Sequence, residues 1–301
     1  MNFQELRVFS EVARAGGITA AASNLEMAKS AVSKQLSRLE ARLQVKLFAR
    51  SSRRVSLTRE GERLLPRIES ILAEGGRLIE DAHEDTFRTA GTVRIAATPD
   101  FGGLVAREFL PVLLDQYPEL AVTMRLDYGF EDLQDPAIDL AIRIGRVSDE
   151  RLVAHRLGEF RRIVVASPEF AERNVLAQPK DLSSVNCLVF SGSSVSSEWT
   201  LEHRYERGDT EQIPVQGKTA VRGFAAIAGL AETGTGVCCV PEFVVGGAIS
   251  EGRLVHCLPD WATRPTPVYL AYRFGADRIG RVRAVIDSAK AVIPTLLDSG
   301  G

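Results

Sequence analysis

The chain has 301 residues, of which 45% are hydrophobic and 25% are charged. This length predicts about two domains, and the composition excludes a disordered chain and a collagen-like repeat. No apolar run reaches the roughly 18 residues of a membrane-spanning helix, and the first residues carry no secretory signal, so we expect a cytoplasmic protein.

Positive charge is concentrated near the N-terminus. Residues 1–60 contain 11 Lys and Arg against five Asp and Glu, a net charge of +6, whereas the rest of the chain carries −8. A basic segment on an acidic body predicts that only the first segment binds a polyanion.

The N-terminal segment carries three helix patterns. Asn2 and Glu5 have the spacing of a capping box before the first helix, which Gly16 ends. Residues 19–25 predict a second, short helix, and residues 29–43 predict a third.

The third predicted helix has an apolar face and an opposite polar, basic face. Its apolar positions recur at helical spacing, at Val32, Leu36, Leu39 and Leu43. The other face carries Lys29, Ser30, Ser33 and Lys34. Two short helices around a tight break, the second with such a face, predict a helix-turn-helix, so these four side chains are the candidate contacts to DNA base edges.

A wing is predicted directly after this helix. Residues 45–48 and 55–57 have the pattern of two strands, separated by a basic turn. The helix and the wing together supply the expected phosphate contacts, Lys34, Arg38, Arg50, Arg53 and Arg54. For any one of these features alone, the alternative is an ordinary solvated helix face or hairpin.

Residues 1–65 resemble the DNA-binding domain of LysR-type transcriptional regulators. The resemblance is carried by Phe9-Ser10-Glu11-Val12-Ala13, Thr19-Ala20-Ala21-Ala22, Ser30-Ala31-Val32-Ser33-Lys34-Gln35-Leu36, Arg38-Leu39-Glu40, Leu47-Phe48-Ala49-Arg50 and Leu57-Thr58-Arg59-Glu60-Gly61. The family usually has serine as the N-cap of the recognition helix, where this chain has Ala28. Because alanine accepts no hydrogen bond from the free N–H groups, we expect Ala28 to cost about 1 kcal/mol of helix stability.

A long helix is predicted over residues 59–85, with Thr58 as its cap. Its apolar positions have the spacing of a seam between two copies of the helix, and the predicted dimer contacts are Leu65, Ile68, Leu72 and Ile79. The alternative is that this face docks on its own domain. Gly75 lies on the same stripe, where it either weakens the helix or permits close approach of another helix.

A two-fold dimer places two recognition helices on a near-palindromic DNA site. The family resemblance further implies a homotetramer built from two such dimers.

From Thr92 onward the sequence alternates between strand and helix patterns. Strands are predicted at residues 93–97, 120–126, 139–144, 163–166, 187–190, 237–240 and 268–272, and helices at 102–117, 224–233 and 241–250. This alternation predicts an α/β fold with largely parallel sheets.

The second region resembles the effector-binding domain of the same family, which has the periplasmic-binding-protein type 2 fold. The stretches that carry the resemblance are Phe109-Leu110-Pro111, Tyr117-Pro118, Asp139-Leu140-Ala141-Ile142-Arg143, Val165-Ala166-Ser167-Pro168, Gly234-Thr235-Gly236 and Val240-Pro241-Glu242-Phe243.

Together, the two resemblances imply three parts in order along the chain. A winged helix-turn-helix occupies residues 1–58, a dimerising linker helix 59–88 and a two-lobed effector domain 91–301. The first lobe comprises residues 91–162 and 268–301, and the second comprises 163–267. Chain crossings near Arg162 and Pro267 form the expected hinge.

Ligands of open α/β sheets bind beyond the carboxyl ends of strands, near helix N-termini. This rule and the resemblance give the candidate effector contacts Thr98, Pro99, Asp100, Phe101, Arg143, Arg146, Ser191, Ser193, Arg222 and Phe224. Arg222 either adds a cation to the cleft, which favours an anionic effector, or forms a surface ion pair. Asp100 either caps its own helix or selects a ligand with a hydrogen-bond donor.

The resemblance implies a sequence-specific DNA-binding transcriptional regulator, controlled by a small, anionic metabolite that binds between the lobes. One alternative is a thiol-redox-responsive regulator, although the adjacent Cys238 and Cys239 lie in an apolar run and differ from the loop-separated cysteines of redox-sensing relatives. Another, in a different class, is a small-solute-binding protein. The sequence shows neither metal-ligand spacing nor a catalytic motif, so we expect no metal, no cofactor and no enzymatic activity.

Overall fold

The computed structural model describes residues 2–50, 55–83, 89–129, 137–147, 149–191, 195–206 and 208–298. The chain forms two compact units, one of Met1–Asp85 with Gln134–Ile138 and one of Thr86–Leu133 with Asp139–Gly301. The first unit holds the basic N-terminal segment, and the second holds the α/β region.

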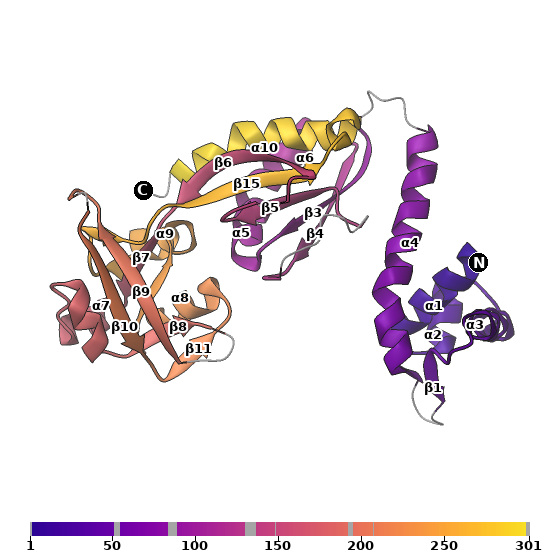
Figure 1. The fold of residues 1–301 in the computed structure, drawn as a ribbon, viewed down its shortest axis with the longest axis horizontal. Coiled ribbons are helices and arrows are strands. Elements are labelled where there is room, and N and C mark those ends of the chain that lie inside the picture. Colours follow the sequence, from indigo (N-terminus) through magenta and orange to yellow (C-terminus); the bar gives the residue numbers. More distant parts are fainter. Residues whose placement is uncertain are drawn as a thin grey trace. The chain divides into compact units, whose positions relative to one another are not determined.

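The N-terminal unit is a winged helix-turn-helix followed by a long helix (Figure 1). Its elements are α1 (Phe3–Ala15), α2 (Ile18–Asn24), α3 (Lys29–Leu43), β1 (Phe48–Arg50), β2 (Val55–Leu57) and α4 (Arg59–His83). β1 and β2 pair antiparallel, with Phe48 opposite Leu57. The predicted order of elements is confirmed, and α3 has the predicted bounds.

The capping box predicted at the start of α1 does not form. The side chain of Asn2 accepts a hydrogen bond from the N–H of Gln4 at 3.0 Å. Glu5 instead turns into the core, where it is 3% exposed and its carboxylate lies 3.5 Å from the guanidinium of Arg42. Because a buried carboxylate requires a cationic partner, Glu5 links α1 to the end of α3.

Helix α4 begins close against the wing. Thr58 caps it as predicted, because its Oγ1 accepts a hydrogen bond from the N–H of Gly61 at 3.0 Å. A Cβ atom at Gly61 would lie 2.3 Å from the backbone carbonyl oxygen of Leu47. Only glycine therefore allows this approach of the helix to the backbone before β1.

The apolar stripe of α4 packs at least partly on its own domain. Ile68 is 4% exposed and belongs to the core, against which Leu65 and Leu72 also pack. A Cβ atom at Gly75 would lie 2.2 Å from the ring of Phe3, so this glycine accommodates the start of α1. The assignment of Ile68 to a dimer contact is wrong, because its side chain is already buried within its own domain.

The second unit has two lobes, each built on one sheet. The first lobe comprises β3 (Gly91–Ala97), α5 (Pro99–Leu104), the π-helix Val105–Phe109, α6 (Leu110–Gln116), β4 (Leu120–Leu126), β5 (Leu140–Ile144), β6 (Leu152–Phe160), β15 (Thr266–Arg273), the 3-10 helix Ala276–Arg278 and α10 (Gly280–Asp298). Its strands lie in the order β4-β3-β5-β15-β6.

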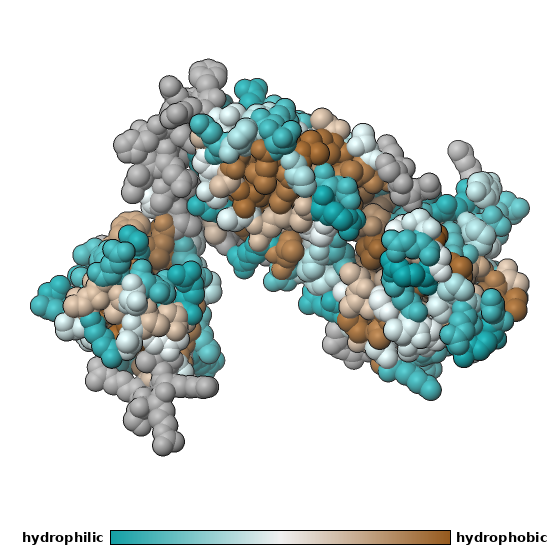
Figure 2. All heavy atoms as spheres, turned by 180° about the vertical axis from the view of Figure 1, so that it is seen from behind, coloured by the Kyte–Doolittle hydropathy of each residue, from teal (hydrophilic) through white to brown (hydrophobic). Residues whose placement is uncertain are grey.

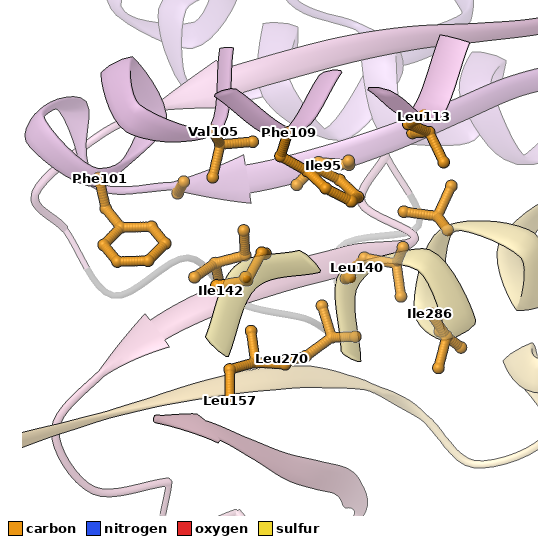
Figure 3. Packing of buried hydrophobic residues seen from close by; sticks show 14 of the residues in the cluster. Ile95, Phe101, Val105, Phe109, Leu113, Leu140, Ile142, Leu157, Leu270 and Ile286 are labelled. Atoms are coloured by element: carbon orange, nitrogen blue, oxygen red, sulfur yellow. The ribbon is translucent and has the colours of Figure 1, made fainter. Parts of the chain in front are cut away.

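One apolar cluster fills the first lobe. Figure 3 shows Phe101, Phe109 and Leu113 of the α5–α6 segment directed at strand residues such as Ile95, with Ile286 of α10 in the same cluster. Hydrophobic residues also appear on the surface of this lobe (Figure 2), and Val112 and Leu114 of α6 are among its exposed apolar side chains.

The second lobe contains the chain between the two crossings. Its elements are β7 (Arg162–Ala166), α7 (Pro168–Arg173), the 3-10 helix Pro179–Ser184, β8 (Cys187–Phe190), β9 (Ser196–His203), β10 (Thr210–Gln216), β11 (Thr219–Val221), α8 (Phe224–Glu232), β12 (Val237–Pro241), α9 (Glu242–Ser250), β13 (Val255–His256) and β14 (Trp261–Ala262). The strand order is β10-β9-β14-β7-β12-β8-β11, with β13 also paired to β7.

Successive residues of β7 enter two different cores. Ile163 and Val165 pack in one cluster with residues of α8 and α9, and Val164 and Ala166 pack on the other face with Phe170 of α7. This alternation explains why the residues of β7 after Arg162 and those of the neighbouring β12 are apolar, since both faces of the sheet are covered.

The sheets are mixed, which corrects the prediction of largely parallel sheets. The pairs β3–β4, β3–β5, β8–β11 and β8–β12 are parallel. The remaining pairs are antiparallel. β15 returns from the second lobe to run beside β5 and β6, β9 and β10 form a hairpin, β7 pairs with β12, β13 and β14, and β14 also pairs with β9.

Two adjacent chain segments connect the lobes. One passes from β6 to β7 through Arg161, and the other passes from β14 to β15 through Thr263. The hydroxyl of Thr263 accepts a hydrogen bond from the N–H of Arg162 at 2.9 Å, and the N–H of Thr263 donates to the carbonyl of Arg162 at 3.0 Å. The two crossings are therefore hydrogen-bonded to each other. Within the described residues, no helix has the length and apolar character of a membrane span.

Candidate functional site

The polar face of α3 is available to a partner. Val32 and Leu39 are fully buried and hold the helix against the core. On the opposite side, Ser33 is half-buried, and the exposed candidates are Lys29, Ser30, Lys34 and Arg38. None of these three cations forms an ion pair with a described residue, so their charges remain available for phosphates.

Glu40 joins α3 to the wing from inside the domain. Its buried carboxylate accepts hydrogen bonds from the Lys46 ammonium at 2.6 Å and from the N–H groups of Leu47 and Phe48 at 2.9 and 3.4 Å. Burial opposes the charge, but these hydrogen bonds together lower the pKa of Glu40 below its usual value. Glu40 therefore fixes the start of the wing relative to the recognition helix.

Several predicted contacts lie outside the described residues. They are Arg53 and Arg54 of the wing turn, Ser193 after β8, and the side chains of Arg50 and Ile79. Their predicted roles remain proposals.

A cavity of about 310 Å³ lies between the lobes of the second unit. The described residues that line it come from both lobes and from both crossings: Thr98, Asp100, Tyr128, Ile144, Phe160, Arg162, Phe190, Phe224, Pro241, Phe243 and Thr266. Of the predicted effector contacts, the cavity brings together Thr98, Asp100 and Phe224.

Aromatic rings form much of the cavity wall. Phe190 and Phe224 are stacked with centroids 4.2 Å apart, and Tyr128 meets Phe190 edge-on at 5.5 Å. Phe160 and Phe243 form a second edge-to-face pair at 5.1 Å. Such walls favour a flat, apolar ligand body.

Asp100 connects the two lobes across this cavity. Its carboxylate accepts hydrogen bonds from the N–H groups of Phe224 and Ala225 at 3.2 and 2.9 Å, and from the hydroxyl of Tyr128. Because Gly223, the N-cap of α8, supplies no side-chain acceptor, Asp100 caps a helix of the opposite lobe. Burial and then the Asp100 hydrogen bond raise the pKa of Tyr128. Neither predicted role of Asp100, capping of its own helix or recognition of a ligand donor, describes these contacts.

Arg162 is the cation of the cavity. It begins β7 at the first crossing, and its guanidinium has no ion-pair partner among the described residues. Thr98 adds a second unused polar group, since its Oγ1 is buried without a hydrogen-bond partner. Among the described lining residues, a ligand thus meets one cation without an ion pair, Arg162, and one hydroxyl without a hydrogen bond, that of Thr98.

The remaining predicted contacts lie away from the cavity lining. Phe101 is fully buried in the core of the first lobe and does not line the cavity. Arg143 lines an adjoining hollow of about 90 Å³, which shares Thr98, Tyr128 and Ile144 with the cavity. Arg222 is exposed and lies over the ring of Tyr128, 5.5 Å from its centroid, in neither of the two predicted roles. The described residues that line neither hollow also include Pro99, Arg146 and Ser191.

Sequence reasoning missed lining residues from both lobes and from the crossings, among them Tyr128, Phe160, Arg162 and Phe190. The sequence did point to the hinge near Arg162 but did not direct its side chain into the cleft. Phe190 ends a predicted strand, the type of position from which ligand contacts come, and Tyr128 follows β4 in the same way. Phe160 ends β6, a strand that the sequence pattern did not predict.

The four cysteines are poorly suited to redox sensing. Cys187, Cys238 and Cys239 are buried, and Cys257 is half-buried. Burial raises the pKa of Cys187 to about 12, of Cys239 to about 11 and of Cys257 to about 11. Because the thiolate is the reactive form, these environments disfavour reaction with oxidants.

Both halves of the chain match known families. Residues 3–62 match the family described as "Bacterial regulatory helix-turn-helix protein, lysR family", and residues 88–294 match "LysR substrate binding domain". The chain is 33% identical over 291 residues to the HTH-type transcriptional regulator PtxR of Pseudomonas aeruginosa, covering 96% of this chain and 92% of PtxR.

Two solved full-length structures have the same fold. AphB, a Vibrio cholerae virulence activator, superposes with a TM-score of 0.66 at 22% identity, covering 96% of this chain and 98% of AphB. CrgA of Neisseria meningitidis superposes with a TM-score of 0.56 at 25% identity, covering 100% of this chain and 99% of CrgA. With matches over its DNA-binding and its ligand-binding halves, the chain belongs to the LysR-type transcriptional regulators, which bind DNA and are not enzymes.

Proposed function

We propose that the protein reads a specific operator with α3 and responds to a small anionic effector held between the two lobes of residues 91–301. The observation that carries the proposal is the exposed polar face of α3, on which Lys29, Lys34 and Arg38 have no partner among the described residues. Base edges are read by Lys29, Ser30, Ser33 and Lys34. Phosphates are contacted by Lys34, Arg38, Arg50, Arg53 and Arg54.

The active form is a homodimer on a near-palindromic site, and two dimers form a tetramer. Residues 1–58 serve as the DNA-binding domain and 59–88 as the dimerising linker. In α4, Leu65 and Leu72 keep part of their surface exposed, and with Ile79 they form the proposed seam. A bacterial regulator of this kind works beside the chromosome, in the cytoplasm.

The effector acts by changing the angle between the lobes about the paired crossings. The cavity shared by both lobes is the place where a ligand changes that angle, since its binding energy differs between open and closed forms. The free guanidinium of Arg162 supports an anionic effector.

DNA selection from a random duplex library with the full-length protein tests this function. We expect an enriched near-palindromic sequence, and an affinity for it that falls steeply with salt. Lys34→Ala is expected to lower the slope of log affinity against log salt by about one and to lose about 1–3 kcal/mol of sequence discrimination. Lys218→Ala is the matched control, since Lys218 is an exposed lysine of the other unit. A salt-independent affinity or an unaffected Lys34 variant would contradict the proposal.

A further inference from the structure

The interlobe cavity contains two charged side chains among its described lining residues, Asp100 and Arg162. The charge of Asp100 is compensated within the protein, whereas among the described residues that of Arg162 is not. Asp100 is satisfied by three hydrogen bonds, two of them from the first N–H groups of α8. The positive end of α8 is therefore already neutralised by a carboxylate that belongs to the protein.

Arg162 has no such compensation. Its strand partner in β12 is Pro241, and the next residue, Glu242, is paired with Arg204. Two further carboxylates near the crossings also form ion pairs, Glu159 with Arg156 and Glu202 with Arg264. The guanidinium of Arg162 thus lines an aromatic cavity without an ion-pair partner among the described residues. A partly desolvated charge of this kind gains most from a carboxylate supplied by a ligand.

The other lining residues indicate the size and polarity of the rest of that ligand. The stacked pair of Phe190 and Phe224 and the edge-to-face pair of Phe160 and Phe243 offer apolar surfaces. The volume of about 310 Å³ lies at the lower end of small-molecule pockets. A compact molecule with one ring or one short hydrocarbon chain fits such a space.

We infer that the effector is a small monocarboxylate with an aromatic or aliphatic body, that its carboxylate pairs with Arg162, and that Asp100 excludes ligands with a second carboxylate. This inference rests on the proposed effector function of the cleft. Asp100 occupies the α8 N-terminus, the other place in the cavity where an anion would be stabilised. A dicarboxylate would bring its second charge toward Asp100, at the cost of like-charge repulsion.

Ligand binding to the full-length protein tests the role of Arg162. The probes are 3-phenylpropanoate and its uncharged amide, measured by thermal shift and titration calorimetry at millimolar concentrations. We expect the acid to bind at least about tenfold more tightly than the amide, the size of effect that a charged hydrogen bond supplies. Arg162→Gln is expected to abolish this preference, whereas Arg283→Gln, at an exposed arginine of α10 outside the cavity lining, preserves it.

A second pair of probes tests Asp100. Hexanoate and adipate share a six-carbon chain and differ by one carboxylate. The native protein is expected to prefer hexanoate, and Asp100→Ala is expected to raise the affinity for adipate about tenfold while that for hexanoate changes little. Asp100→Asn keeps an acceptor for α8 without the charge, so it separates loss of the charge from loss of the interlobe contact.

Three results would overturn the inference: equal binding of acid and amide, an acid preference that survives Arg162→Gln, or no thermal shift with any carboxylate probe. Operator binding is measured on the same preparations. Intact operator binding together with one of these results rejects the ligand class and leaves the proposed regulator function standing, whereas loss of operator binding in the native protein rejects that function itself.

Discussion

The recognition helix lacks the side chain that ordinarily stabilises its start, and restoring that side chain should strengthen the domain. Ala28 occupies the N-cap position with extended φ and ψ of −64° and 139°, and no side chain caps α3. Ala28 is exposed, so a serine there buries nothing. A serine Oγ in this conformation is within reach of the N–H groups of Ser30 and Ala31.

The expected gain for Ala28→Ser is about 1 kcal/mol. For a domain of roughly 60–100 residues, this corresponds to a rise in melting temperature of about 4–8 °C. Thermal unfolding of a fragment of residues 1–85, followed by circular dichroism, measures it. Ala28→Thr and Ala28→Val form a matched pair of equal shape, of which only threonine carries an acceptor. An unchanged melting temperature in the serine variant, or an equal rise for threonine and valine, would refute the capping argument.

Three further outcomes follow from the packing of the described residues. Glu40→Gln should cost about 1–3 kcal/mol of unfolding free energy at neutral pH. Because the folded pKa of Glu40 is lowered, this advantage of the native protein should shrink as the pH falls below 4.5, and a constant difference would contradict it. Gly61→Ala should destabilise by about 1–3 kcal/mol, since its Cβ meets a backbone oxygen, whereas Gly103→Ala, in open space on α5, should not. The four thiols should react slowly with Ellman's reagent in the native protein and fully after unfolding, and rapid native labelling would revive the redox alternative.

The elements that the sequence predicted best are those with one apolar face and one polar face. Helix α3 was predicted with its observed bounds because Val32, Leu36 and Leu39 recur at helical spacing against a polar face. Apolar strands that are buried on both faces, such as β8 and β12, were also found. Among the strands that were missed, β6, β9 and β10 have half-exposed patterns interrupted by charged residues, and β6 pairs with a strand distant in sequence, β15.

The apolar stripe on α4 shows what hydrophobic spacing does not predict. A spacing of three and four residues predicts that one face is apolar, but it does not identify what covers that face. Ile68 packs in the core of its own domain, and Gly75 lies against the ring of Phe3. The choice between docking and dimerisation depends on the distance between α1 and α4, which no local pattern contains.

The interlobe contact of Asp100 was beyond prediction by the usual rule that an acidic residue in the first turn serves its own helix. The free N–H groups at the start of each helix are a better guide to such a contact. Every helix has free N–H groups at its start, and α8 begins after Gly223, which has no side chain to offer. The stretch Arg222-Gly223-Phe224 therefore requires an acceptor from elsewhere in the fold. The fold supplies it from the first turn of α5, where Asp100 accepts from the N–H groups of Phe224 and Ala225, and Arg162 is then the charged residue without an ion pair among the described lining residues.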